Sequence, residues 1–232
     1  KARHAAVLEF WKTGTLDPEC NVQFGEGGAG TFSDGKLNTG VKNERIGWIL
    51  EQFAGAGASA DILYDAKPHI GTDELVTVVQ NLRETIIHYG GEVRFGVKVT
   101  GLVTEDGRVT GVRAAQGGEA AVIPASCVLL AIGHSARDTF EALHAQGVPM
   151  EPKPFSMGVR IEHPQRLVNE SQYGPFADAP GLGAADYKLN VRLPDGSSAY
   201  TFCMCPGGYV VAAASEEGGV VTNGMSDPVS YT

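Results

Sequence analysis

A chain of 232 residues with 43% hydrophobic and 19% charged residues has the composition of a globular protein, and it is long enough for one large or two small domains. Its net charge of −9 argues against nucleic acid as a partner, because phosphate contacts need a basic surface. No apolar run approaches the roughly 20 residues of a membrane span, and the four cysteines are too scattered for a disulfide framework. We therefore expect a cytoplasmic protein with no nucleic-acid or membrane partner. No second cysteine pair or histidine cluster has a recognisable metal-ligand spacing, so we expect no metal site.

Apolar residues at helical spacing predict three helices in the first ninety residues. The first covers residues 2–13. The second follows Asn43, whose side chain is a good helix cap, and ends at Gly55. The third follows the cap residue Thr72 and ends at Gly90.

Between residues 92 and 132 the apolar period changes from helical to strand-like. The dipeptide Asp106-Gly107 predicts a tight hairpin turn between two of these strands. The last run is continuously apolar, as in a strand buried on both faces, and it leads into Gly133 and a further helix. The predicted strands cover residues 92–95, 97–104, 109–114, 120–123 and 127–132.

From Pro149 onward prolines become frequent and helical periodicity disappears. Strand-like runs then cover residues 155–161, 187–193, 199–204 and 209–214. We therefore predict an α/β fold with a domain boundary near residues 148–154. Residues 1–148 would form a mixed α/β domain with an antiparallel hairpin, and residues 149–232 would form a β-rich domain.

The stretch Phe24-GEGGAGTFSDGKL-Asn38 matches two nucleotide-binding patterns by spacing. Gly25, Gly27 and Gly30 spell the dinucleotide fingerprint, but no strand of ordinary length precedes them and no helical pattern follows. Residues 30–36 approach a phosphate loop, yet Leu37 stands where that loop needs Ser or Thr to hold Mg²⁺. Two interpretations fit the residues better: a structural loop that uses glycine for positive φ angles, or a nest of backbone N–H groups that binds an anion.

The segment FWKTGTLDPECNVQFGEGGAGTFSDGKLNT resembles a segment of the uncharacterised FAD-dependent oxidoreductases, also called FAD-utilising dehydrogenases. Similar blocks follow in the same order, namely KPHIGTDELVTVVQNLR, GEVRFGVKVTGL, LLAIGHSARDTFEAL, EPKPFSMGVRIEHPQ and YTFCMCPGGYVVAAASEEGGVVTNGMS. The resemblance implies a partial glutathione-reductase-like FAD domain over residues 1–148 and a substrate domain over residues 149–232. It also implies that the chain corresponds to the middle portion of such a flavoprotein, without the N-terminal Rossmann unit.

The same resemblance implies which residues contact the cofactor. The glycine stretch would approach the isoalloxazine and ribityl region, Val99 would lie near the adenine, and the turn at Gly133 would lie near the pyrophosphate or ribityl chain. The cofactor-binding residues expected on this basis are Gly25, Gly27, Gly28, Gly30, Ser33, Asp34, Gly35, Lys36, Leu37, Val99, Gly133 and Ser135.

Four residues are candidates for a role in the chemistry, and each has a plain structural alternative. Cys203 and Cys205 share one face of a strand and could take part in redox chemistry, or they could be buried as small hydrophobes. His134 could relay protons beside a flavin, or it could be a structural residue next to a turn. Lys36 could stabilise negative charge on a reduced flavin, or it could be an ordinary surface lysine.

We therefore expect the full-length protein to be an enzyme, an FAD-dependent oxidoreductase that transfers hydride between a small-molecule substrate and FAD, with NAD(P)H as a candidate co-substrate. One alternative is that this chain is a non-catalytic binding module taken from a flavoprotein. The other is a nucleotide hydrolase that uses residues 30–36.

Overall fold

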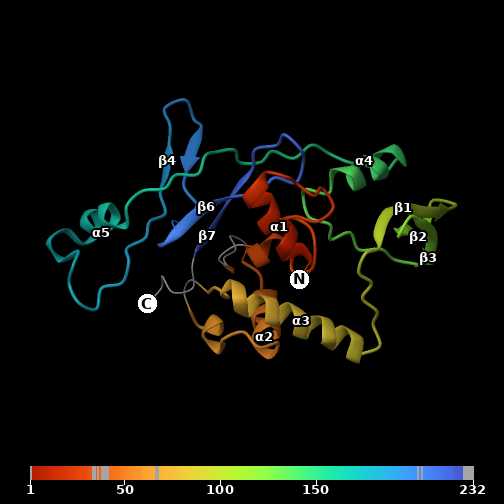
Figure 1. Cartoon of the computed structure of the whole chain (residues 1–232), viewed down its shortest axis with the longest axis horizontal. Coiled ribbons are helices and arrows are strands. Elements are labelled where there is room, and N and C mark those ends of the chain that lie inside the picture. The colour runs from red at the N-terminus through yellow and green to blue at the C-terminus, as the bar shows by residue number, and fades with distance from the viewer. Residues whose placement is uncertain are drawn as a thin grey trace. The chain divides into compact units, whose positions relative to one another are not determined.

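The computed structural model describes residues 2–32, 35, 37, 42–65, 68–202, 204 and 206–226 and shows a mixed α/β chain with small antiparallel sheets (Figure 1). Its contacts divide the chain into two compact units. The first unit contains Lys1–Leu82 and Gly158–Thr232, and the second contains Arg83–Met157. No helix in the described ranges is long and apolar enough to cross a membrane. The predicted division into domains at residues 148–149 stays a prediction.

The predicted helices of the N-terminal third are all present. They are α1 (Ala2–Thr13), α2 (Arg45–Gly55) and α3 (Thr72–His88), with short 3-10 helices η1 (Gly28–Phe32) and η2 (Ala60–Leu63) between them. The side chain of Asn43 accepts a hydrogen bond from the backbone N–H of Arg45, but the N-cap of α2 is Glu44, which makes no side-chain capping bond, so the predicted cap is wrong by one residue. Gly14 and Gly90 follow α1 and α3 with φ angles of +78° and +84°, which glycine adopts without strain. Thr72 is the first residue of α3 rather than its cap.

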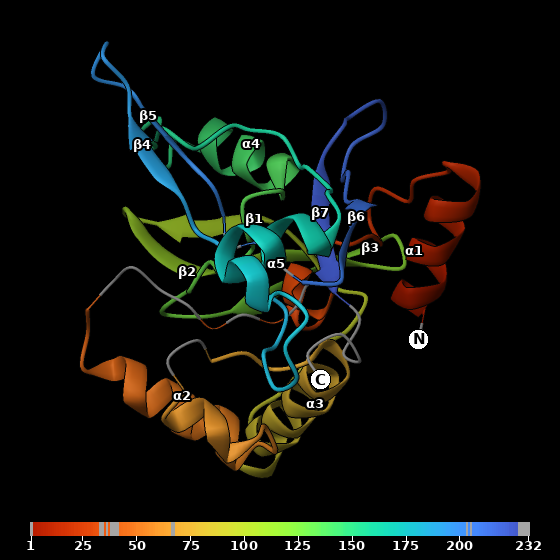
Figure 2. The same cartoon turned by 90° about the vertical axis from the view of Figure 1, so that its left-hand side faces the viewer.

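Among the described residues, the C-terminal part of the first unit contains one α-helix, the 3-10 helix η3 (Gly174–Phe176) and two antiparallel hairpins (Figure 2). The helix α5 (Gln165–Tyr173) was not predicted and begins directly after Pro164. The hairpins pair β4 (Asn190–Arg192) with β5 (Ser198–Tyr200) and β6 (Gly208–Ala212) with β7 (Thr222–Ser226). Three predicted strands are confirmed as β4, β5 and β6, whereas the predicted strand over residues 155–161 is wrong.

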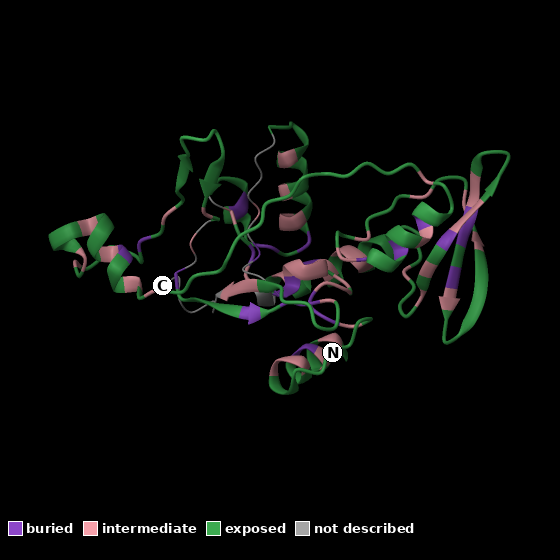
Figure 3. Cartoon of the chain, turned by 90° about the horizontal axis from the view of Figure 1, so that it is seen from above, coloured by how far each residue is buried: buried purple, intermediate pink, exposed green. Residues whose placement is uncertain are grey.

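Two small hydrophobic clusters of buried residues lie in the first unit. Figure 3 colours the chain by burial and shows that buried residues are few and scattered among exposed ones. One cluster joins the N-terminal helix to the β6–β7 hairpin and consists of Val7, Val22, Phe32 and Ala213, with Trp11 and Met225 packed against it. The other lies among α2, η2 and α3 and consists of Ala56, Ala58, Ile62, Ile70 and Val78. The glycine stretch contributes to both clusters, through Phe32 and Leu37.

The second unit is a three-stranded antiparallel sheet with one helix. The strands β1 (Lys98–Glu105), β2 (Arg108–Gln116) and β3 (Glu119–Pro124) lie in that order, and α4 (Arg137–Ala145) contacts β1. Asp106 and Gly107 have φ angles of +47° and +75°, so the predicted hairpin turn is confirmed. Directly after α4, the Gln146 side chain accepts a hydrogen bond from the Leu102 backbone N–H at 2.9 Å.

Two predicted strands of the second unit are wrong. Residues 92–95 form no strand, and Arg94 there pairs with the carboxylate of Glu92 at the surface, with an Nε–Oε1 distance of 2.6 Å. Residues 127–132 also form no strand, and Leu129 is 90% exposed. A strand that is buried on both faces needs a neighbouring strand and covering layers, and the described residues provide neither for this run.

Candidate functional site

The N-terminal part of the glycine stretch wraps around one side chain, Arg3 of α1. We call residues 21–32 the Arg3 loop. All five N–H groups of the guanidinium donate a hydrogen bond, and each has a different acceptor in the loop. The acceptors are the carbonyl oxygens of Asn21 (2.9 Å from Nε), Val22 (2.6 Å from Nη2), Glu26 (3.0 Å from Nη1) and Gly28 (2.6 Å from Nη2), and the hydroxyl oxygen of Thr31 (3.2 Å from Nη1).

The positive charge of Arg3 has no carboxylate partner among the described residues. Burial lowers the pKa of Arg3, and the ionised form of Cys20 acts in the opposite direction. The guanidinium also lies over the Phe32 ring, with its central carbon 4.7 Å from the ring centroid. The loop therefore encloses a partly desolvated cation whose hydrogen-bond acceptors among the described residues are neutral oxygens and which lies over one aromatic face.

The glycines of the loop are explained by this packing. Gly25 has a φ angle of +121°, and a Cβ there would lie 2.6 Å from Cδ of Arg3. Gly27 has a φ angle of +81°, and a Cβ there would overlap the methyl group of Thr31. Gly28 has a φ angle of +57° with open space around it. Two of the three fingerprint glycines, Gly25 and Gly27, are thus required by the loop's shape, whereas a Cβ at Gly30 would make only an ordinary contact with Leu75. The 3-10 helix η1 stands where that motif requires an α-helix.

The β6–β7 hairpin and α1 hold the Arg3 loop from outside. The side chain of Gln23 donates to the carbonyl oxygen of Ala213 at 3.2 Å. The side chain of Asn223 donates to the carbonyl oxygen of Phe32, also at 3.2 Å. Trp11 of α1 donates from Nε1 to the Ala212 carbonyl oxygen at 2.8 Å. Residues almost two hundred positions apart in the sequence therefore share one polar and apolar cluster.

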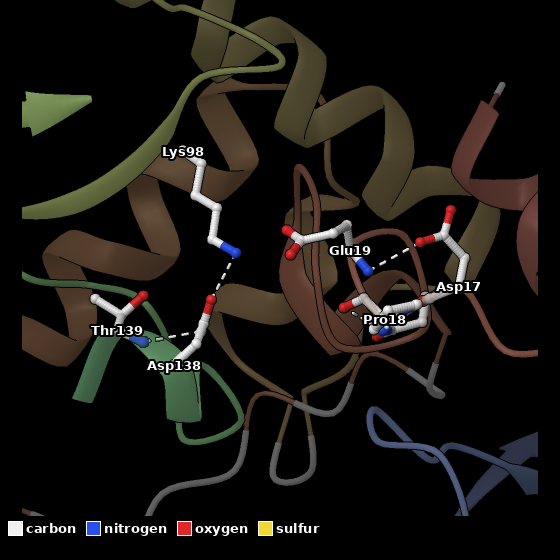
Figure 4. Close-up of polar contacts among 7 residues, drawn as sticks. Asp17, Pro18, Glu19, Lys98, Asp138 and Thr139 are labelled. Carbon is white, nitrogen blue, oxygen red and sulfur yellow. Dashed lines mark hydrogen bonds and ion pairs between the residues drawn. The ribbon is translucent and has the colours of Figure 1, made fainter. Parts of the chain in front are cut away.

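The start of the loop is fixed by a turn around Asp17 and by Asn21. The Asp17 carboxylate accepts from the backbone N–H of Glu19 at 2.9 Å (Figure 4). Asn21 is 2% exposed, and its amide donates to the carbonyl oxygens of Asp17 (3.0 Å) and Pro18 (3.3 Å). Its side-chain oxygen accepts from the Gln23 N–H at 2.9 Å, so this buried amide is well satisfied.

The C-terminal part of the glycine stretch pairs with the segment before α3. The N–H of Ile70 donates to the Gly35 carbonyl oxygen, and the N–H of Leu37 donates to that of Pro68, both at 2.9 Å. Gly35 has a φ angle of +63°, and a Cβ there would overlap the carbonyl oxygen of Ile70. Ser33, Asp34 and Lys36, which we predicted to contact the cofactor, lie outside the described residues, as do Cys203 and Cys205.

The remaining predicted site residues belong to the second unit. Val99 is half-buried in β1 opposite Ala114. Gly133 has a φ angle of +72° and is followed by the exposed His134, whose Nδ1 lies 3.4 Å from the hydroxyl of Ser135. These residues precede α4, but the strand that we expected to deliver them is not formed.

An ion pair joins the first turn of α4 to strand β1. The ammonium group of Lys98 lies 2.6 Å from the Asp138 carboxylate, and Asp138 also accepts from the Thr139 N–H at 2.8 Å (Figure 4). The hydrogen bond from Lys98 is the main reason that the pKa of Asp138 is lowered.

Sequence reasoning missed Arg3, Thr31 and Asn21. Nothing in the sequence marks Arg3, because its acceptors are mostly backbone carbonyls. A further histidine, His163, lies in the loop before α5. His163 makes a hydrogen bond of 2.8 Å from Nε2 to the Tyr187 hydroxyl, while its Nδ1 is buried without a partner in the described part of the chain.

Comparison with known proteins gives a family match for the C-terminal third of the chain. Residues 154–229 match the family described as FAD-dependent protein, C-terminal domain-like. Over 227 residues the chain is 51% identical to an uncharacterised protein of Clostridium beijerinckii (strain ATCC 51743 / NCIMB 8052). The aligned region covers 97% of this chain and 42% of that protein. The chain therefore spans less than half of this relative's length. The family match supports a flavoprotein-related domain; it gives no support for NAD(P)H.

Proposed function

We propose that this chain is part of an FAD-dependent oxidoreductase in which the Arg3 loop, together with residues 33–37, lies against the flavin. The observation that carries the proposal is the match of residues 154–229 to an FAD-dependent family. The β6–β7 hairpin lies inside the matched segment and is hydrogen-bonded to the Arg3 loop through Gln23 and Asn223. The loop is thus joined directly to the part of the chain that carries the family's pattern.

The chemistry of the loop fits the electron-rich parts of FAD. The described peptide bonds are trans, so the C=O of one residue and the N–H of the next point in opposite directions. Because Arg3 draws the carbonyls of Glu26 and Gly28 toward itself, the N–H groups of Gly27 and Ala29 point away from it. Donors held in this way above a cation that has no carboxylate partner among the described residues suit a pyrophosphate or the oxygens of the flavin pyrimidine ring.

FAD, when bound, supplies the acceptor or donor of hydride at N5. The chain's own residues would bind and orient the flavin through the backbone of Gly25, Gly27, Gly28 and Gly30. Of these, Gly28 has open space at its Cβ position, where a ligand can approach the backbone. Burial of Phe32 and Val22 beneath the loop keeps water away from its carbonyl side. We place no residue in the chemical step itself: Lys36, His134, Cys203 and Cys205 remain candidates.

A flavin titration of the native full-length polypeptide tests the proposal. Flavin would first be removed, and FAD would then be added while the visible absorbance is recorded. We expect saturable binding with one FAD per chain and a perturbed spectrum. A chain that leaves the spectrum of FAD unchanged at saturating concentrations would support the non-catalytic module instead.

A pair of glycine variants localises the binding. Gly27→Ala places a methyl group against Thr31 at a φ of +81° and should weaken FAD binding by about tenfold or more. Gly118→Ala changes a glycine with a φ of +91° and open surroundings in the turn between β2 and β3, and should leave the affinity within about twofold. Equal affinities for the two variants would contradict the placement of the flavin at the Arg3 loop.

A further inference from the structure

We propose that Arg3 is the positioning residue of the Arg3 loop: it holds the loop's carbonyls inward and supplies the positive charge beneath the bound flavin. The inference rests on the proposed function, because it concerns the same ligand. It goes beyond that function in assigning the loop's shape and charge to one side chain of α1 that lies outside the glycine stretch and outside the matched family segment.

The geometry supports this role because a single side chain closes the whole loop. Its acceptors are spread from Asn21 to Thr31, and no N–H group of the guanidinium is left over. Lysine has three donors on one nitrogen and could not reproduce a planar fork with five bonds. The loop conformation therefore depends on arginine itself and not only on a positive charge.

The charge of Arg3 points to the class of ligand. Partly buried charges in proteins are normally paired, yet this cation has no carboxylate partner in the described ranges. An electron-rich ligand above the loop would complete the pair across the intervening peptide groups. Flavin gains negative charge on reduction, so a nearby fixed cation stabilises the reduced form and raises its reduction potential.

The same geometry excludes direct contact between the guanidinium and the ligand, because every donor already has an acceptor in the loop. Arg3 acts through the loop's peptide groups, which it orients, and through its field. It is therefore a positioning residue, and its loss should change the flavin's potential as well as the loop's order.

Two substitutions separate the hydrogen bonds from the charge. Arg3→Met removes both while keeping a long apolar stem, and Arg3→Lys keeps the charge with fewer donors. Arg166→Met is the matched control, because Arg166 is 78% exposed and forms an i,i+4 ion pair with Glu170 on α5. All three variants would be made in the native full-length polypeptide, with circular dichroism to verify folding.

Three quantities are measured on each variant: amide hydrogen exchange over residues 21–32 without flavin, the dissociation constant for FAD, and the midpoint potential of bound FAD. For Arg3→Met we expect exchange to rise by about tenfold or more, affinity to fall by at least about tenfold, and the potential to become more negative. Arg3→Lys should raise exchange while keeping the potential close to that of the native protein, and Arg166→Met should alter none of the three.

Unchanged exchange over residues 21–32 in folded Arg3→Met would overturn the inference. So would increased exchange with unchanged affinity and potential, since the loop would then not be the flavin's contact. If Arg3→Met does not fold, Arg3→Lys decides: unchanged exchange over residues 21–32, or raised exchange with unchanged affinity for FAD, would overturn the inference. Native protein that binds no FAD would refute the proposed function separately, and the inference would fall with it.

Discussion

At Gly35 the backbone leaves no room for a side chain. Its φ angle is +63°, and a Cβ would overlap the carbonyl oxygen of Ile70, whose own N–H donates to the Gly35 carbonyl. We predict that Gly35→Ala lowers the free energy of unfolding by about 2–4 kcal/mol, because the bridge to Ile70 must open. Chemical denaturation of the purified variant measures this.

Gly28→Ala is the control for backbone strain alone. Gly28 has a φ angle of +57° but nothing within 4 Å of its Cβ position. Its substitution should cost only about 1 kcal/mol, the cost of a left-handed conformation for alanine. If Gly35→Ala and Gly28→Ala lowered the free energy of unfolding by similar amounts, the contact with Ile70 would be unimportant for stability.

Residues in the glycine stretch could be recognised from sequence, whereas their anchor could not. The density of glycine and its near-matches to nucleotide motifs identified residues 25–37 as unusual. Arg3 looks like an ordinary polar residue of a surface helix, because hydrogen bonds to carbonyl oxygens leave no trace in the sequence. Thr31 and Asn21 are similarly hidden, since each acts mainly on nearby backbone groups.

At the scale of secondary-structure elements, the Lys98–Asp138 pair ties β1 to α4 and gives the second unit a pH dependence. The Lys98 hydrogen bond lowers the pKa of Asp138, and the Thr139 N–H adds to this effect. Since the folded-state pKa is below the unfolded value of about 3.9, the pair stabilises the fold above that pH and the benefit is lost as pH falls through the folded pKa.

We predict that Asp138→Asn removes this pH dependence at a small cost. Both side chains are about half exposed, at 44% for Lys98 and 56% for Asp138, so the pair should contribute less than about 1 kcal/mol, and less in high salt. Thermal unfolding between about pH 2 and pH 6 provides the measurement. A larger stability difference between the variant and the native protein at pH 3 than at pH 6 would contradict the assignment.

Elements with local signals were predicted well, and elements that depend on neighbours were not. The β1–β2 hairpin is set by Asp106-Gly107, and α3 is set by its own apolar spacing and the glycines after it. The run at residues 127–132 looks like a buried strand, but burial requires partner strands that its own sequence cannot specify. The helix α5 was missed because only Val168 of its residues is buried, so its pattern is almost entirely polar.

At the scale of the whole molecule, the chain combines a family-matched segment with an N-terminal part that the match does not cover. The two meet inside the first unit, where Phe32, Val22 and Val7 pack with Ala213. This packing explains how segments at opposite ends of the sequence can build one site. The chain spans 42% of the length of its Clostridium beijerinckii relative.

Hydrogen exchange of the native full-length polypeptide with and without FAD tests the central claim most directly, because it asks whether the flavin contacts the Arg3 loop. We predict that FAD slows exchange of the amides in residues 21–32, those of Gly27 and Ala29 among them, and leaves the hairpin turn at Asp106-Gly107 unchanged. Saturating FAD that binds without slowing exchange anywhere in residues 21–32 would contradict the account.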